Sequence, residues 1–219
     1  MDLKELIELN DQGWYWPKED AKGQGGAWFD LAGEFSQTPD KVAAVVSNHN
    51  VILQAGGNCG LYVKKYASLF KVVYTFEPDP VNFYCLNLNV TEHNVFKYQA
   101  ALGYHRETIN IANHMPNNVG AKHVQGIGPV PTIRIDDLGL KVCDCIQLDI
   151  EGFELHALHG ARETLVRCRP ILIVEFGWEH RYKITREDID LFLKSIDYSL
   201  EGNLEGAQAD LIYRYTGDE

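Results

Sequence analysis

Beyond residue 40, runs of β-branched and aromatic residues alternate with amphipathic stretches along most of the chain. Apolar runs bounded by turn residues predict strands at 51–54, 72–76, 96–102, 145–150 and 171–176. Helical patterns occupy 38–46, 59–69, 79–92, 152–166 and 185–195. Strands that alternate with helices of this length predict an α/β fold, with a mostly parallel sheet and helices on both of its faces.

The C-terminal part of the chain departs from this alternation. The segments "SIDYSLEGN" and "QADLIYRY" are typical of strands, and only a short stretch separates them. Two strands without an intervening helix predict a hairpin, so the last strand should run antiparallel to the others.

Two other segments are less regular. Residues 104–142 contain the alternating runs "ETINIAN" and "TIRIDDL", joined by a long segment rich in loop-forming residues. A loop of that length in a compact domain is more often functional than idle, and His114 and His123 at its ends are candidates for a lid. The first ten residues, "MDLKELIELN", predict an acidic amphipathic helix and lack the features of a signal peptide.

Composition narrows the classes of function. The chain has 219 residues and a formal net charge of −11, which would repel a nucleic-acid backbone. Its apolar runs are far shorter than the roughly 18–20 residues that cross a bilayer, so no membrane partner is expected. The five cysteines have neither disulfide nor zinc spacing, which favours reduced thiols and a cytoplasmic location. We expect one compact domain, with 1–47 as a helical and aromatic cap and 48–219 as the ligand-binding part.

The first predicted strand ends in a glycine-rich turn, "VILQAGGNCG". Open parallel sheets bind ligands at the carboxyl ends of their strands, and Gly56, Gly57 and Gly60 would allow close backbone approach there. The pattern is not GxGxxG, which disfavours a dinucleotide. A tight turn with packing glycines is the alternative.

Acidic residues follow two other predicted strands. Glu77 stands about 20 residues beyond the glycine turn, the position from which an acid binds vicinal ribose hydroxyls, although a solvated acid is the simpler interpretation. Asp149 and Glu151 follow the strand at 145–150, and two carboxylates this close require a partner or a proton. A ligand amine, a substrate hydroxyl or a metal would each satisfy them.

Taken in order, "VILQAGGNCG", "VYTFEPDP", "FKYQAALG", "TIRIDDL", "CIQLDIEGFELHALHGARETL" and "RPILIVEFG" resemble the FkbM-type S-adenosylmethionine-dependent methyltransferases. The resemblance covers about residues 50–177. It implies a Rossmann-like class I methyltransferase fold, a seven-stranded sheet with the seventh strand antiparallel, and S-adenosyl-L-methionine as cofactor. The cofactor-binding residues it implies are Gln54, Ala55, Gly56, Gly57, Asn58, Gly60, Glu77, Pro78, Asp79, Ala100, Ala101 and Leu102.

The chain departs from the family pattern at two positions. Gln54 stands where the family usually has an aspartate, and Gln147 where it usually has a lysine. If that aspartate binds the cofactor's ammonium group, Gln54 would weaken the site by about 1 kcal/mol, nearly tenfold in affinity, without abolishing it.

These observations favour O-methylation of a small molecule or a sugar hydroxyl. Asp149 is the first candidate for the general base, followed by Glu151 and His180, with Glu175 as a candidate for orienting the acceptor. No metal is demanded by the spacing. A catalytically weakened binding or scaffold protein, suggested by Gln54 and Gln147, is the main alternative, and an NAD-type oxidoreductase is a weaker one.

The acceptor partner is expected to be a small molecule or a glycan. Additions outside the shared core usually select the acceptor in such enzymes. The aromatic N-terminal segment, with Trp14, Tyr15, Trp16 and Trp28, could therefore stack on a ligand or simply pack against the sheet. The sequence leaves the oligomeric state open, and a homodimer is one alternative.

Overall fold

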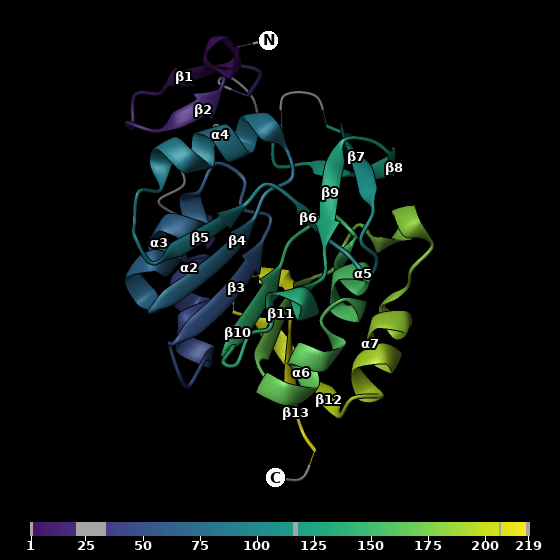
Figure 1. Ribbon diagram of the computed structural model, residues 1–219. Helices are drawn as coiled ribbons and strands as arrows, with labels where there is room; N and C mark the ends of the chain where they lie inside the picture. The colour runs from purple at the N-terminus through teal and green to yellow at the C-terminus, as the bar shows by residue number, and fades with distance from the viewer. Residues whose placement is uncertain (1, 21–33, 116–117, 206, 218–219) are drawn as a thin grey trace.

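The computed structural model describes residues 2–20, 34–115, 118–205 and 207–217 of the chain. Its central sheet has seven strands in the order β12-β13-β11-β10-β3-β4-β5 (Figure 1). These strands are β3 (Val51–Ala55), β4 (Val72–Phe76), β5 (Val95–Tyr98), β10 (Cys145–Leu148), β11 (Ile171–Glu175), β12 (Tyr198–Leu204) and β13 (Ala207–Tyr215). β3, β4, β5, β10 and β11 are parallel, and β13 runs antiparallel to β11. The predicted parallel sheet with an antiparallel last strand is confirmed.

Helices cover both faces of this sheet. The described helices are α2 (Glu34–Val45), α3 (Leu61–Leu69), α4 (Pro80–Asn89), α5 (Glu154–His159), α6 (Arg162–Cys168) and α7 (Arg186–Lys194). α2, α3 and α4 share one apolar core with the sheet, and α5, α6 and α7 share another. Neighbouring Ile52 and Leu53 enter different cores because successive strand residues point to opposite faces. α7 begins at the predicted place, where Thr185 and Asp188 form a capping box.

The predicted helix at 152–166 is interrupted between α5 and α6 at Gly160. A Cβ at Gly160 would lie 2.1 Å from the carbonyl oxygen of Gly103, so the chain passes too close for any side chain there. The Gly160 carbonyl instead accepts a hydrogen bond from Asp136 N at 2.9 Å. A neighbouring segment, distant in sequence, therefore decides where this helix breaks.

The strand predicted at 96–102 is also divided, since β5 ends at Tyr98 and Ala101 begins a strand of a second sheet. That sheet has the order β6-β9-β7-β8 and comprises β6 (Ala101–Leu102), β7 (Thr108–Asn113), β8 (Lys122–Ile127) and β9 (Val130–Ile133), with the 3₁₀ helix η2 (Ile135–Leu138) after it. Beyond Tyr98 the chain leaves β4 and pairs with β9 instead. Most of the irregular segment 104–142 thus forms a small sheet beside the carboxyl ends of the main strands (Figure 1).

The predicted N-terminal helix is wrong beyond Leu6. A short 3₁₀ helix, η1 (Leu3–Leu6), leads into a hairpin of β1 (Ile7–Leu9) and β2 (Tyr15–Pro17). Asn10 Oδ1 closes the turn by accepting from the backbone N–H of Gln12 and Trp14. The hairpin packs on α4 at the top of Figure 1, whereas α2 belongs to the helical layer on the main sheet. Trp28 lies outside the described residues.

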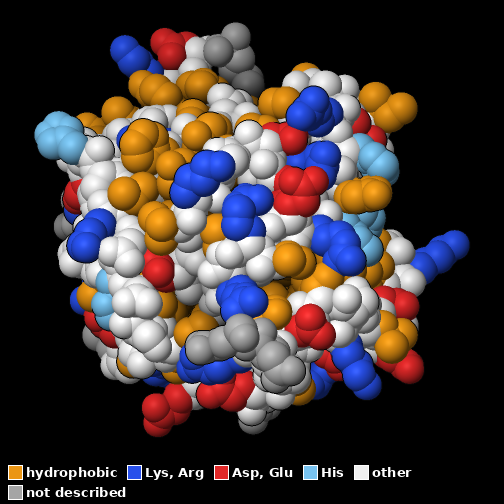
Figure 2. All heavy atoms as spheres, turned by 60° about the horizontal axis from the view of Figure 1, so that its bottom comes forward, with side chains coloured by type: hydrophobic (Ala, Val, Ile, Leu, Met, Phe, Trp, Pro, Cys, Tyr) orange, Lys and Arg blue, Asp and Glu red, His pale blue; other side chains and the backbone are white. Residues whose placement is uncertain are grey.

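No helix in the described ranges is long and apolar enough to cross a bilayer. On the face seen in Figure 2, basic and acidic side chains are interspersed with hydrophobic ones, so no single sign of charge covers it.

Candidate functional site

A cavity of about 270 Å³ lies at the carboxyl ends of β3, β4 and β10, where open parallel sheets bind ligands. The turn after β3 and the residues Ala100, Ala101 and Leu102 line one part of it. Side chains from β7 and β8 and from the segment between them line another part, together with Trp16 and Trp178. The N-terminal hairpin and the second sheet therefore both help to enclose it.

The turn after β3 depends on its glycines for close packing. Gly56 has a φ of +86°, and a Cβ on it would lie 2.0 Å from the carbonyl oxygen of Asp149. A Cβ on Gly57 would meet Thr75 Oγ1 at 2.7 Å. Gly60, with a φ of +97°, lies against Val90 and Leu86 of α4. The glycines let the end of β3 pack closely against neighbouring residues, and Gly60 is the N-cap of α3. Gly60 does not line the cavity.

Gln54 and Gln147 are neighbours in the sheet and lie outside the cavity lining. Gln54 is 1% exposed; its Oε1 accepts from Thr75 Oγ1 at 2.8 Å, and its Nε2 donates to the carbonyls of Ala55 and Gly56. Gln147 Oε1 accepts from Tyr66 Oη at 2.6 Å. Both amides therefore brace the sheet beneath the turn, which corrects the expectation that Gln54 lies among the ligand-facing residues.

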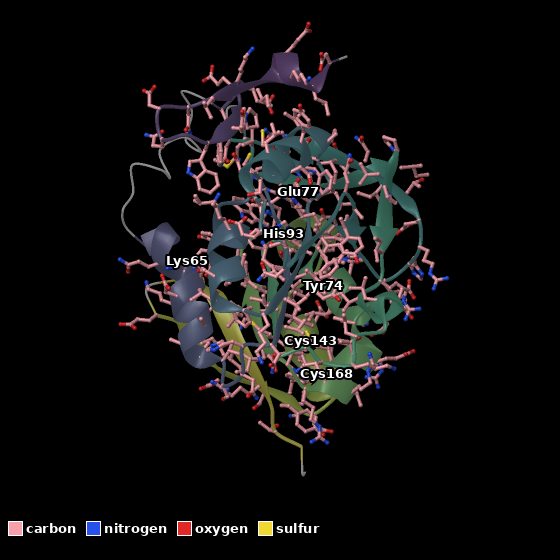
Figure 3. The ribbon with its side chains drawn as sticks, turned by 60° about the vertical axis from the view of Figure 1, so that its left-hand side comes forward. Lys65, Tyr74, Glu77, His93, Cys143 and Cys168 are labelled. Atoms are coloured by element: carbon pink, nitrogen blue, oxygen red, sulfur yellow. The ribbon has the colours of Figure 1, made fainter. Side chains whose placement is uncertain are left out.

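Glu77 follows β4 and lies in the interior at one end of the cavity (Figure 3). Its carboxylate accepts from Asn58 N at 2.7 Å and from Asp79 N at 2.9 Å. Burial, followed by the charge of Asp79, raises the pKa of Glu77 to about 7. The simpler interpretation of Glu77 as a solvated acid does not hold, because the residue is 5% exposed.

Three carboxyl groups meet across the ends of β10, β11 and β13. Asp149 and Glu175 are hydrogen-bonded, and Glu175 pairs in register with Asp210. Burial raises the pKa of Asp149, and the charge of Asp149 followed by burial raises the pKa of Glu175. Burial and the Asp149 charge raise the pKa of Asp210 to about 7. The Asp149–Glu175 pair shares a proton, and both residues line the cavity.

Glu151 is held in the left-handed conformation, with a φ of +59°, which is costly for a residue with a side chain. Its side chain lines the cavity. Its Oε2 is buried without a hydrogen-bond partner, 3.7 Å from Arg181 Nη1 and 3.9 Å from His114 Nε2. Burial, followed by the Asp149 charge, raises the pKa of Glu151 to about 8. Such a carboxyl can take up or release a proton near neutral pH.

An aromatic surface lies beside Glu151. Trp178 lines the cavity, and its ring centroid is 4.5 Å from the Arg181 guanidinium carbon and 5.0 Å from the His114 ring. These contacts hold the indole in place. Phe153 lines the same cavity, so its wall near the carboxyl groups is largely apolar.

The cavity brings together most of the residues predicted from the sequence. Those that line it are Ala55, Gly56, Gly57, Asn58, Glu77, Pro78, Ala100, Ala101, Leu102, Asp149, Glu151 and Glu175. Four predicted residues do not line it: Gln54, Gly60, Asp79 and His180.

Asp79 and His180 both lie outside the cavity lining. Asp79 caps α4 by accepting from the N–H groups of Val81 and Asn82, and it pairs with Lys122 at 2.9 Å. His180 is exposed on the short helix η3 (Glu179–Tyr182), whose buried residue is Glu179. His180 lies beside Trp178, with 6.2 Å between the ring centroids, and outside the cavity lining.

Sequence reasoning missed several lining residues, among them Tyr62, Asn82, Met115, Val119 and Phe153. Tyr62 was detectable in principle, because it lies in the first turn of the helix that follows the glycine turn. Phe153 follows the turn after β10, next to the predicted Glu151. Asn82 comes from α4, and Met115 and Val119 come from the segment between β7 and β8, so only packing brings these three to the strand ends.

The cavity suits a cationic nucleoside such as S-adenosylmethionine. Ala100, Ala101 and Leu102 offer a small apolar surface for a base, and the buried Glu77 carboxyl offers acceptors for hydroxyls. At the ends of β10 and β11, the carboxyl groups of Asp149 and Glu175 offer negative charge for a sulfonium or ammonium group. Within the described residues, no cluster of His, Cys, Asp and Glu has a geometry that could hold a metal ion.

The sequence matches the Methyltransferase FkbM domain family over residues 50–200, more than half of the chain. A comparison with curated proteins finds no match. The fold is similar to that of methyltransferase FkbM from Methylobacillus flagellatus KT, with a TM-score of 0.57 and 17% identity over 88% of this chain and 50% of that one. This chain therefore spans about half the length of that structure.

Two further solved structures support the fold. A TehB-like SAM-dependent methyltransferase from Corynebacterium glutamicum has a TM-score of 0.52 and 12% identity, over 87% of this chain and 95% of that one. Precorrin-6y C5,15-methyltransferase from Geobacter metallireducens GS-15 has a TM-score of 0.51 and 10% identity, over 96% and 99%. The expected class I methyltransferase fold is confirmed, and S-adenosylmethionine is the methyl donor of the matched family. The chain belongs to the FkbM methyltransferase family.

Proposed function

We propose that this chain transfers a methyl group from S-adenosylmethionine to a hydroxyl oxygen of a small molecule or sugar. The observation that carries this proposal is the set of carboxyl groups of Asp149, Glu151 and Glu175 on one cavity, whose pKa values are raised by burial and by one another's charge. Methylation of an alcohol requires removal of its proton, and a carboxylate such as that of Glu151, whose pKa is about 8, can receive one in its ionised form near that pH.

The cofactor supplies an electrophilic methyl group on a sulfonium. With the cofactor bound, transfer would form a bond between the acceptor oxygen and the methyl carbon as the S–C bond broke, its electron pair remaining on sulfur. The hydroxyl proton passes to a carboxylate of the chain. Glu151 is our first candidate for that carboxylate, since Asp149 is already hydrogen-bonded to Glu175. Asp149 and Glu175, which both line the cavity, would face the acceptor and the cationic end of the cofactor.

The apolar wall formed by Trp178 and Phe153 favours an acceptor with an apolar or ring-shaped body. The alternative of a weakened binder rested on Gln54 and Gln147. Because both side chains bond within the protein beneath the turn, no observation favours that alternative.

The proposal is tested first by isothermal titration calorimetry with S-adenosylmethionine and S-adenosylhomocysteine, using NAD as control. We expect micromolar binding of the first two and none of NAD. Methyl transfer to a panel of alcohols, phenols and methyl glycosides, with amines and thiols as comparison, then tests the acceptor class. Transfer to amines alone, or failure of the folded protein to bind either cofactor form, would contradict the proposal.

A further inference from the structure

The turn that carries Glu151 packs directly against the chain that leads into η3. A Cβ on Gly152 would lie 2.5 Å from the carbonyl oxygen of Trp178, so only glycine lets the two segments approach this closely. The same carbonyl accepts from Arg181 N at 3.1 Å. On the other side of the contact, Glu154 Oε1 accepts from the backbone N–H groups on both sides of Glu151. Backbone contacts therefore set Glu151 and Arg181 relative to each other.

The Glu151 carboxyl faces two different environments. Its Oε2 lies 3.7 Å from Arg181 Nη1 and 3.9 Å from His114 Nε2, and all three atoms are buried without a hydrogen-bond partner in the protein. At these distances the contact is an attraction between charges rather than a formed hydrogen bond. The Glu151 side chain is nevertheless 14% exposed and lines the cavity. Its Oε2 is thus turned toward the protein, and the rest of the side chain is turned toward the cavity.

Arg181 is the permanent positive charge on the protein side of Glu151. The Arg181 guanidinium carbon lies 4.5 Å from the centroid of the Trp178 ring, a cation–π contact that holds it in place. His114 is charged only when protonated, and burial, followed by the charge of Arg181, lowers its pKa. Near neutral pH the positive charge beside Oε2 is therefore that of Arg181.

The other groups around Glu151 are acidic or neutral. Asp149, at the end of β10, raises the pKa of Glu151 after burial does, and Glu175 of β11 also interacts with its charge. Tyr182 of η3 lies within reach of the same charge. A buried carboxyl among other acids tends to keep its proton, and a protonated carboxyl cannot accept another. Arg181 opposes this tendency.

We propose that Arg181 is a positioning residue for methyl transfer: it holds Oε2 of Glu151 from behind the cavity wall and favours the ionised carboxylate, which can then accept the hydroxyl proton of the acceptor. This inference rests on the proposed function and deepens it. Arg181 lies outside the cavity lining, so it acts through Glu151 and not on the acceptor itself.

The first readout is the titration of Glu151, which needs no acceptor. Carbon-13 NMR of protein labelled at the glutamate carboxyl carbon follows the carboxyl groups against pH, and Glu151→Gln identifies the Glu151 signal by its loss. Ligand-free wild type is compared with Arg181→Met and Arg181→Lys. Lys183→Met is the matched control, because it removes an exposed positive charge just beyond the same short helix. Arg181→Gln replaces Arg181→Met if that variant does not fold.

In Arg181→Met, Glu151 should bind its proton about tenfold more tightly than in the wild type, because an opposite charge this close favours the ionised form by about that factor or more. Arg181→Lys should retain most of the wild-type behaviour, and Lys183→Met should retain all of it. An unchanged titration of Glu151 in Arg181→Met would overturn the inference, since Arg181 would then only pack against Trp178.

The second readout is the pH dependence of methyl transfer to the alcohol or glycoside that the acceptor panel identifies. In Arg181→Met the acid limb of kcat/KM should move to higher pH by about one pH unit, with the affinity for S-adenosylhomocysteine unchanged. If the Glu151 titration shifts and the acid limb does not, Glu151 is not the base, and the role of Arg181 in transfer is overturned. If the wild type neither binds the cofactor nor transfers methyl, the proposed function fails, and the NMR titration still decides whether Arg181 controls Glu151.

Discussion

Gln54 illustrates how one residue's role depends on the direction of its side chain. It stands at the end of β3, where the family pattern has an aspartate, yet its amide is buried and bonded to Thr75, Ala55 and Gly56. The amide donates to two carbonyl oxygens, which no carboxylate can do. The residue type is therefore matched to a structural position rather than to the ligand.

Replacement of Gln54 by glutamate should consequently destabilise the protein. An ionised carboxylate would face the carbonyls of Ala55 and Gly56 in a buried site, and we expect a loss of about 2–4 kcal/mol in the free energy of unfolding. Urea denaturation at pH 8 measures it, with the exposed Glu201→Gln as control. Unchanged stability of Gln54→Glu would contradict the structural role.

Glu77 leads to a prediction about pH. Its pKa of about 7 in the ligand-free protein means that binding of ribose hydroxyls to the ionised carboxylate requires loss of a proton below pH 7. Asp79 raises this pKa and Lys122 lowers it, so both belong to the environment that sets it. Affinity for S-adenosylhomocysteine should fall about tenfold from pH 8 to pH 6, and Glu77→Gln should remove the dependence. Equal pH profiles for wild type and variant would refute this.

At the level of elements, the N-terminal hairpin packs its apolar side chains against α4, and Asn89 of that helix adds hydrogen bonds to its backbone. Asn89 Oδ1 accepts from Tyr15 N at 2.8 Å, and its Nδ2 donates to the carbonyls of Tyr15 and Cys59 at 2.9 and 2.8 Å. One amide thus connects β2 with Cys59 in the glycine turn. Trp16 reaches the cavity because of this attachment.

Asn89→Ala should therefore release the hairpin before it affects the sheet. We expect a loss of about 1–3 kcal/mol and faster deuterium exchange confined to residues 7–17. Asn87→Ala, exposed on the same helix, should leave exchange there unchanged. Uniformly faster exchange across β3 and β10 would mean that the hairpin is not a separate unit of stability.

For the whole molecule, buried carboxyl groups near the strand ends make stability depend on pH. The pKa values are raised to about 7 for Glu77 and Asp210, and to about 8 for Glu151 and Glu154. Burial is the first cause in each case. A carboxyl whose folded pKa exceeds its unfolded value stabilises the fold fully at low pH, and this stability is lost as pH rises through the folded pKa.

Ligand-free protein should accordingly lose about 2–4 kcal/mol of stability between pH 6.5 and pH 8.5. The histidines with lowered pKa values titrate mainly below this window of pH. There, unlike the carboxyl groups, they make the stability rise as pH increases. Glu154→Gln keeps an acceptor for the N–H groups of Ile150 and Gly152 and should flatten the profile. Thermal unfolding between pH 6.5 and pH 8.5 measures the stability of the wild type and of Glu154→Gln. A wild-type stability that rises with pH would contradict this prediction.

The order of strands and helices, the antiparallel last strand, the glycine turn and the acids after β4 and β10 were determined by the sequence itself. They depend on hydrophobic periodicity and local turn chemistry, which act between residues close together in the chain. Other features depend on contacts between distant segments, and only the tertiary structure decided them. Residue 160 must be glycine because Gly103 crowds it, and Asp136 bonds to the chain where the helix breaks. Gln54 faces Thr75. Asn82 bonds to Val119 only after α4 and the segment before β8 have packed together.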